Sequence, residues 1–369
     1  MSQILKNRFL WIYGSLFVFV LYLCFYNMER NEIGDVDIIR AIGIDEADGV
    51  YTISGIYSEF GGTDASAGGL KMISGKGDSI YEAYQDMKLR NQRDITIAHT
   101  SFYLLSDSTA RAGLESALDF IVRDHSTKIS ASVYIYETGN VEKYMEDSIN
   151  KEEAIHESLA SIHQKQQTRL TKMDNSLNLI ISKMYDKYSS ILIPYITNDG
   201  EHAVMNGYAV FLNDHLISYL DYDISVGVDL LRNRLRKCPI ILENNIGIEV
   251  TKYHVSKQAD IVNGDIQVTF EVDFESDIRQ VPTKDEVFEE YYLTYLNKQQ
   301  NDYIVGVVNK TVVYMMENRV DLVGISNTIE SDLIKEWETI QGNWNYYFKK
   351  INYKYDVVSR IGKNYVLSR

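Results

Sequence analysis

The sequence predicts an α+β protein: an N-terminal membrane anchor or signal, then two to three mixed α/β domains with mainly antiparallel sheets. Three observations lead to this class. The chain has 369 residues, more than one hydrophobic core usually organises. Its first residues contain a long apolar run beside basic side chains. Beyond that run, helical and strand-like patterns mix without a regular strand–helix–strand alternation.

The N-terminal apolar run predicts a membrane anchor. Lys6 and Arg8 precede the run from Phe9 to Tyr26, and no charged side chain follows until Glu29. As a helix this run spans about 27 Å, close to the roughly 30 Å core of a bilayer. Because the basic flank comes first, the positive-inside rule places residues 27–369 outside the cytoplasm. We interpret residues 1–26 as a signal peptide or an uncleaved signal anchor.

Cys24 offers a second way to tether the chain. A basic region, an apolar region and a cysteine near its end are also typical of a lipoprotein signal. The segment Leu21-Tyr22-Leu23-Cys24 has a bulky leucine where such signals have glycine or alanine. Both a transmembrane anchor and a lipid on Cys24 stay open, and either one attaches the protein to a membrane. The only other cysteine is Cys238, so no internal disulfide framework is expected.

The charge of the chain excludes two classes of partner. Without Lys6 and Arg8, 35 basic side chains face 52 acidic ones, which gives a formal charge of −17. Such a domain is repelled by nucleic acid and by anionic lipid headgroups. We therefore expect no nucleic-acid partner.

Residues 27–198 are expected to form an N-terminal α+β region. Alternating apolar residues predict strands, and a turn at Asp48-Gly49 joins the first two. Asn150 with Glu153 resembles a capping box that opens a helix. The predicted strands are 38–45, 51–57, 100–105 and 129–136, and the predicted helices are 80–91, 110–122, 150–166 and 177–188.

Residues 203–369 are expected to form a C-terminal α+β domain, after a polar stretch at 198–201 that we take as the main boundary. Asn263-Gly264 is typical of a tight turn between two long strands. The predicted strands are 207–212, 216–220, 246–254, 265–274 and 351–358, and the predicted helices are 224–234, 284–317 and 329–337.

Motifs that carry chemistry are absent. Gly75-Lys76-Gly77 lacks the spacing of a phosphate-binding loop, so a strand-to-helix turn is expected there. His156 and His163, with Glu152, predict a solvated helix face, because the two imidazoles would lie about 10.5 Å apart along the axis. No Gly-x-Ser-x-Gly, His-Glu-x-x-His or Cys-x-x-Cys occurs. We expect no catalytic residue, no metal ligand and no cofactor.

Several segments together resemble the Ger(x)C or GerAC family, the C subunits of spore germinant receptors. The resemblance runs in order over nearly all of residues 31–369. The similar segments are 31–33, 41–45, 75–87, 96–99, 113–124, 207–211 and 320–324, followed by Trp337 and Trp344.

The resemblance implies a non-catalytic subunit with a fold of three mixed α/β domains. It implies a place on the extracytoplasmic face of the spore inner membrane, beside an integral-membrane A subunit and a transporter-like B subunit. A small-molecule germinant would be contacted at most indirectly. The motif positions Gly43, Asp45, His99, Arg123 and Asp124 are expected to be structural.

Two other functions remain alternatives at this point. A tethered cell-wall hydrolase would need two carboxylates about 5–10 Å apart, one with a raised pKa. A substrate-binding lipoprotein would need two similar lobes around a cleft, and the sequence shows no internal repeat.

Overall fold

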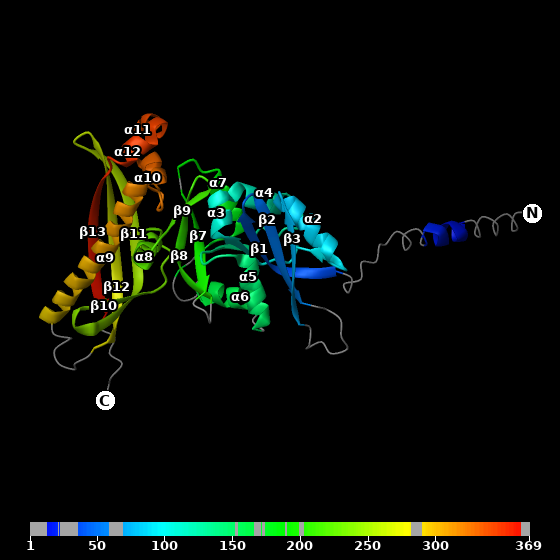
Figure 1. Cartoon of the computed structure of the whole chain (residues 1–369). Helices are drawn as coiled ribbons and strands as arrows, with labels where there is room; N and C mark the ends of the chain where they lie inside the picture. Colours follow the sequence, from blue (N-terminus) through cyan, green and yellow to red (C-terminus); the bar gives the residue numbers. More distant parts are fainter. Residues whose placement is uncertain are drawn as a thin grey trace, which may run out of the picture.

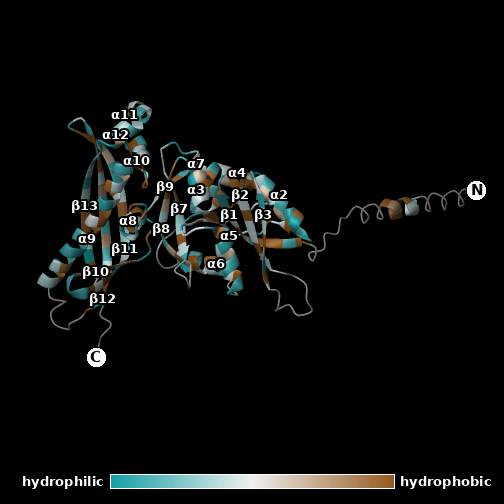
Figure 2. Cartoon of the chain, in the orientation of Figure 1, coloured by the Kyte–Doolittle hydropathy of each residue, from teal (hydrophilic) through white to brown (hydrophobic). Residues whose placement is uncertain are grey.

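A computed structural model describes residues 13–20, 22, 36–58, 69–151, 154–165, 171, 174–188, 190–198, 203–281 and 290–362. Two sheets with their helices lie side by side (Figure 1). Residues 13–20 and 22 are helical and include hydrophobic residues (Figure 2). Their large apolar side chains are exposed. No helix within the described ranges is long and apolar enough to cross a membrane. Cys24 and the rest of the apolar run lie outside these ranges.

The first sheet has nine strands among the described residues, in the order β3-β2-β1-β5-β6-β7-β8-β9, with β4 beside β1. Its centre is parallel, because β1, β5, β6 and β7 run the same way, and the flanking pairs are antiparallel. The strands are β1 (Val36–Ala47), β2 (Val50–Ser58), β3 (Leu70–Gly77), β4 (Asp94–Thr96), β5 (Phe102–Ser106), β6 (Ser132–Tyr136), β7 (Ile191–Asn198), β8 (Ala203–Leu212) and β9 (His215–Tyr219).

Helices cover both faces of this sheet. On one face α2 (Ile80–Arg90), α3 (Asp107–Ala112), α4 (Leu114–Arg123) and α7 (Leu177–Met184) share a core with Tyr103 and Val133. On the other face α5 (Val141–Asn150) and α6 (Ile155–Lys165) pack against Leu104 and Tyr134. Neighbouring strand residues thus enter opposite cores, which is why β5 and β6 are buried along their whole length.

The second sheet has four strands among the described residues, in the order β10-β11-β12-β13, with β13 parallel to β12. Its strands are β10 (Cys238–Leu242), β11 (Ile246–Val262), β12 (Asp265–Gln280) and β13 (Asn352–Gly362). The accompanying helices are α8 (Tyr222–Leu231), α9 (Glu290–Asn318), α10 (Ile325–Asp332), α11 (Ile334–Ile340) and α12 (Trp344–Phe348). Buried and open residues alternate along β12, so one face of this sheet is packed and the other meets solvent.

The α+β class is confirmed, but several elements differ from the prediction. The centre of the first sheet is parallel, whereas antiparallel pairing was expected. The predicted helix at 110–122 is two helices, because Gly113 breaks it with φ 129°. Asn150 ends α5, and Asn140 caps that helix, so the capping-box prediction at Asn150 was wrong. Glu153 lies outside the described residues.

The predicted boundary near residues 198–203 falls between two strands of one sheet. β7 and β8 pair antiparallel, from Ile191 opposite Phe211 to Asn198 opposite Ala203. The core of the second sheet is continuous with the α5–α6 side of the first, as both contribute to one buried cluster. The helix predicted at 284–317 is described from Glu290 to Asn318.

Candidate functional site

Gly43 and Asp45 hold α5 against the first sheet. A β-carbon at Gly43 would lie 2.5 Å from Val141 Cγ1, so only glycine lets the helix approach β1 this closely. The backbone N–H groups of Val141 and Glu142 donate to the two oxygens of Asp45, each over 2.8 Å. Burial raises the pKa of Asp45, and these hydrogen bonds oppose that shift. Asp45 thus caps the first turn of α5.

His99, Arg123 and Asp124 lie on the surface. His99 is exposed in the turn between β4 and β5. The Arg123 guanidinium pairs with Asp119 at 2.7 Å along α4 and is 77% exposed. Asp124 follows α4 and accepts hydrogen bonds from the backbone N–H and hydroxyl of Ser126. Because α4 and α5 cover opposite faces of the sheet, the five motif positions do not form one site.

Gly75-Lys76-Gly77 ends β3 just before α2, as predicted. A β-carbon at Gly75 would lie 2.2 Å from the carbonyl oxygen of Ala83 in α2. The backbone N–H of Lys76 donates to Asp86 of the same helix over 2.9 Å. Close strand–helix packing explains both the glycines and the turn.

The two histidines of α6 are half-buried, so the prediction of a solvated face was wrong. The Tyr134 hydroxyl lies 3.0 Å from His163 Nδ1, and burial lowers the pKa of both His156 and His163. His156 Nδ1 is buried without a hydrogen-bond partner among the described residues. Glu152 lies outside those residues. Within the described ranges, no group of three His, Cys, Asp or Glu side chains could hold a metal ion.

A buried polar pair at the junction of the two sheets was not predicted. The Tyr208 hydroxyl on β8 donates to Asp229 of α8 over 2.8 Å, and both residues are buried. Burial raises the pKa of Asp229 to about 6, because the charged form loses water. No local sequence pattern predicts this contact, because the two residues meet only when β8 and α8 pack together.

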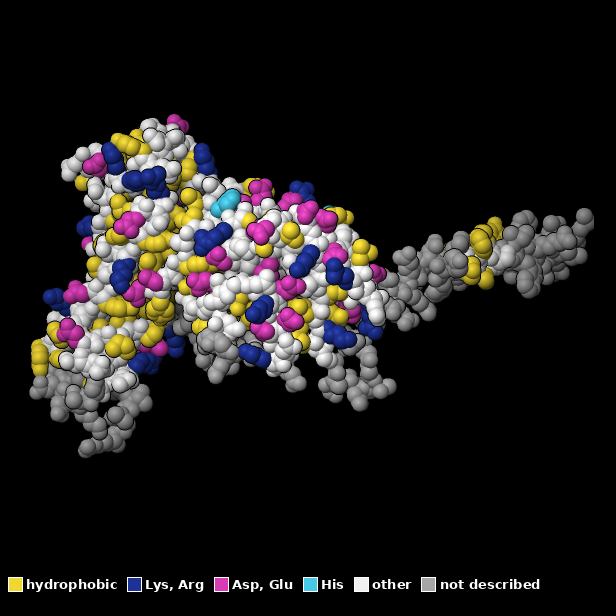
Figure 3. Space-filling view, viewed as in Figure 1, with side chains coloured by type: hydrophobic (Ala, Val, Ile, Leu, Met, Phe, Trp, Pro, Cys, Tyr) yellow, Lys and Arg dark blue, Asp and Glu magenta, His cyan; other side chains and the backbone are white. Residues whose placement is uncertain are grey.

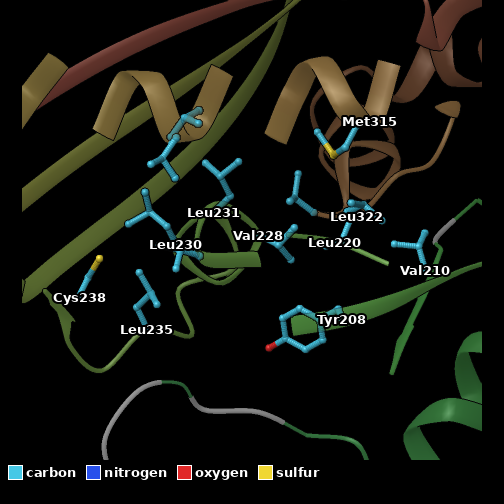
Figure 4. Close-up of a cluster of buried hydrophobic side chains, with 14 of the residues drawn as sticks. Tyr208, Val210, Leu220, Val228, Leu230, Leu231, Leu235, Cys238, Met315 and Leu322 are labelled. Carbon is cyan, nitrogen blue, oxygen red and sulfur yellow. The ribbon is translucent and has the colours of Figure 1, made fainter. Parts of the chain in front are cut away.

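A cavity of about 90 Å³ lies beside this pair. Its lining includes Tyr222, Ser225, Lys237 and Cys238. Figure 4 shows Leu235 beside Cys238, with the Tyr208 ring pointing toward the same space. Burial raises the pKa of the Cys238 thiol to about 12, so it stays protonated and is a poor nucleophile. The cavity thus holds one titrating carboxyl and no activated nucleophile.

Another deeply buried carboxylate also caps a helix. Asp321 accepts hydrogen bonds from four successive backbone N–H groups, those of residues 323–326, which open α10. It also accepts from the Ser326 hydroxyl over 2.8 Å. Like Asp45, this acid is engaged by backbone, so its chemistry is structural.

Comparisons with known proteins match most of the chain to one family. The family model described as the spore germination protein N-terminal domain matches residues 29–198. The model described as spore germination B3/GerAC like, C-terminal, matches residues 206–364.

Individual relatives are distant but cover most of the chain. Spore germination protein KC of Bacillus subtilis is 23% identical, over 86% of this chain and 86% of its own length. The putative spore germination protein YfkR of the same organism is 21% identical, over 85% and 88%. The crystal structure of the GerBC protein has the same fold, with a TM-score of 0.58 at 17% identity, covering 87% of this chain and 96% of that one. The chain belongs to the GerAC family of spore germination proteins.

Proposed function

We propose that the chain is a membrane-tethered, non-catalytic subunit of a spore germinant receptor. Membership of the GerAC family supports a role in spore germination, and the match of both family domains over residues 29–198 and 206–364 carries the proposal. On this proposal it sits on the extracytoplasmic face of the spore inner membrane with integral-membrane A and B subunits. It touches the small-molecule germinant at most indirectly.

The described part of the N-terminal helix supports the tether. Tyr13, Phe17 and Val18 are each more than 60% exposed. Such side chains are stable in contact with lipid and unfavourable in water. We therefore propose that residues 1–26 attach the chain to the membrane, and that residues 27–198 and 203–369 are the parts its partners recognise.

A non-catalytic role is supported by the hydrogen-bond partners of three buried aspartates. Asp45 and Asp321 are engaged as helix caps, and Asp229 contacts a tyrosine hydroxyl. A hydrolase would use its raised-pKa acid together with a second, ionised carboxylate. The cavity beside Asp229 is lined by no second carboxylate among the described residues.

Two measurements test the parts of this proposal. Spores lacking the chain should lose their response to at least one nutrient; an unchanged response to every nutrient would contradict the receptor role. For the tether, Cys24→Ala is compared with the wild type by membrane fractionation, palmitate labelling and intact mass. Loss of label and membrane binding assigns a lipid to Cys24. A mutant that stays bound, unlabelled and uncleaved assigns a helical anchor. Recovery of both proteins in the soluble fraction would overturn the tether.

A further inference from the structure

Gly306 stands in the interior of the 29-residue helix α9, and no contact with the described residues requires a glycine there. A β-carbon built at this position meets no atom of those residues within 4 Å. The contrast is Gly227 of α8, where a β-carbon would lie 2.0 Å from Thr311 Oγ1 of α9. Gly227 is therefore required by the contact between the two helices. Gly306 lies on the outer side of α9, where alanine would be the better helix former.

A continuous row of residues runs along this outer side. We call it the α9 stripe; apart from the adjacent pair Asn309 and Lys310, its members follow one another at intervals of three or four and so share one face of the helix. The stripe comprises Tyr291, Tyr295, Lys298, Asp302, Gly306, Asn309, Lys310, Val313 and Glu317. Tyr291 is 63% exposed and Val313 is 41% exposed. On the face shown in Figure 3, hydrophobic side chains gather over α8 and α9.

The charges of the α9 stripe are complementary to those of the same stripe on a second, antiparallel copy of the chain. Asp302 and Lys310 are both exposed and stand four residues before and four residues after Gly306. In two antiparallel helices that cross at Gly306, Asp302 of each copy faces Lys310 of the other. A parallel pair would place each charge opposite its own kind. Lys310 also pairs with Asp223 of α8, so its ammonium group lies at the edge of the stripe beside α8.

We propose that two copies of the chain associate through the α9 stripe, antiparallel, with Gly306 at the crossing point. The missing side chain lets the two backbones approach, and the two Asp302–Lys310 pairs fix the direction. This surface belongs to the chain itself, so the inference does not depend on the receptor role.

The size of the surface predicts a weak dimer. A helix of this length spans about 43 Å, and one helix–helix seam buries less than the roughly 1,200 Å² of the smallest stable interfaces. Association is therefore expected at a Kd of about 10–100 μM in solution. Two chains held on one surface would associate more completely, because their effective concentration is higher.

Charge reversal tests the proposed direction. Full-length chains in detergent carry Asp302→Lys or Lys310→Asp, and sedimentation measures their self-association over a range of concentrations. Each variant alone should associate at least about tenfold more weakly than the wild type, since like charges then meet. An equal mixture of the two variants should recover association, because both pairs are again opposite in sign. Failure of the mixture to exceed its components would overturn the proposal, as would a wild type that stays monomeric at every concentration.

Position 306 supplies a second test that separates folding from association. Gly306→Ala should raise the melting temperature of the single chain yet weaken association, and Gly306→Leu should abolish association. Glu338→Lys, on the exposed side of α11, is the control and should change neither. Lys310→Asp removes the ion pair with Asp223, so its melting temperature is recorded beside its association. A Gly306→Leu chain that pairs as well as the wild type would refute the crossing point.

Discussion

The two sheets of this protein differ in how many of their faces are covered by helices. The nine-stranded sheet is covered by helices on both faces, and Val133 and Tyr134, adjacent in β6, are both fully buried. The four-stranded sheet is covered on one face, and β12 alternates between buried Val272 and exposed Asp273. The uncovered face of the four-stranded sheet can therefore contact other molecules, whereas both faces of the nine-stranded sheet are covered by helices of the chain. The difference shows which substitutions disturb folding and which disturb only contacts with other molecules.

The largest expected effects test this contrast directly. Tyr134→Ala should lower the free energy of unfolding by about 3–5 kcal/mol, and Val133→Ala by about 2 kcal/mol, because both side chains leave cavities. In β12, Val272→Ala should also cost about 2 kcal/mol, but Asp273→Ala should change stability by less than about 0.5 kcal/mol. Urea denaturation measures all four. An unchanged free energy of unfolding in Val133→Ala would contradict the contrast between the two sheets.

The junction between the sheets gives a pH-dependent prediction. Asp229 has a pKa of about 6 in the folded chain against an ordinary value of 3.8. The folded state therefore holds this proton more tightly, and the stability it contributes is present below pH 4 and is lost as pH rises through 6. Relative to Asp229→Asn, the wild type should lose about 2 kcal/mol between pH 4 and pH 7. If the free energy of unfolding depends on pH in the same way in both proteins, Asp229 does not titrate as predicted.

Removing the Asp45 carboxylate from the first turn of α5, where Asn140 remains the N-cap, should have a smaller effect. Asp45→Ala leaves two backbone N–H groups without their acceptor, at Val141 and Glu142. We expect a loss of about 2 kcal/mol in the free energy of unfolding. Hydrogen exchange should localise the change to α5, and unaltered protection of that helix would argue against the cap.

The smallest effect is expected on the outside of the first region. Arg123→Ala removes an exposed ion pair with Asp119, which should change stability by less than about 0.5 kcal/mol. Asp119→Ala is the matched control for the same pair. If Arg123→Ala keeps its melting temperature while spores lose their nutrient response, Arg123 is a contact residue. A drop of several degrees would assign it a structural role instead.

Local patterns in the sequence predicted the second sheet better than the first. The hairpin of β11 and β12 follows from alternating residues and from Asn263-Gly264, both of which have positive φ. The strands β5 and β6 were predicted, but their parallel pairing was not, because five buried residues in a row indicate neither the partner nor the direction of a strand. The position of the turn at Gly75-Lys76-Gly77 was predicted. The contact between Tyr208 and Asp229 was not, since it depends on how a strand and a helix pack.

The family motif likewise located residues without showing what they do. Gly43 and Asp45 fix a helix inside the molecule, whereas Arg123 and Asp124 end a helix at its surface. These roles depend on which face of the sheet each helix covers, and that is a property of the folded chain.

Purification from spores tests the central claim most directly. The tagged chain is isolated from detergent-solubilised inner membranes of spores, and its companions are identified by mass spectrometry. If it is a receptor subunit, two integral-membrane germinant receptor subunits should co-purify with it in constant ratio. If the chain is recovered without them while both remain in the membrane extract, its assignment as a subunit of that receptor is contradicted.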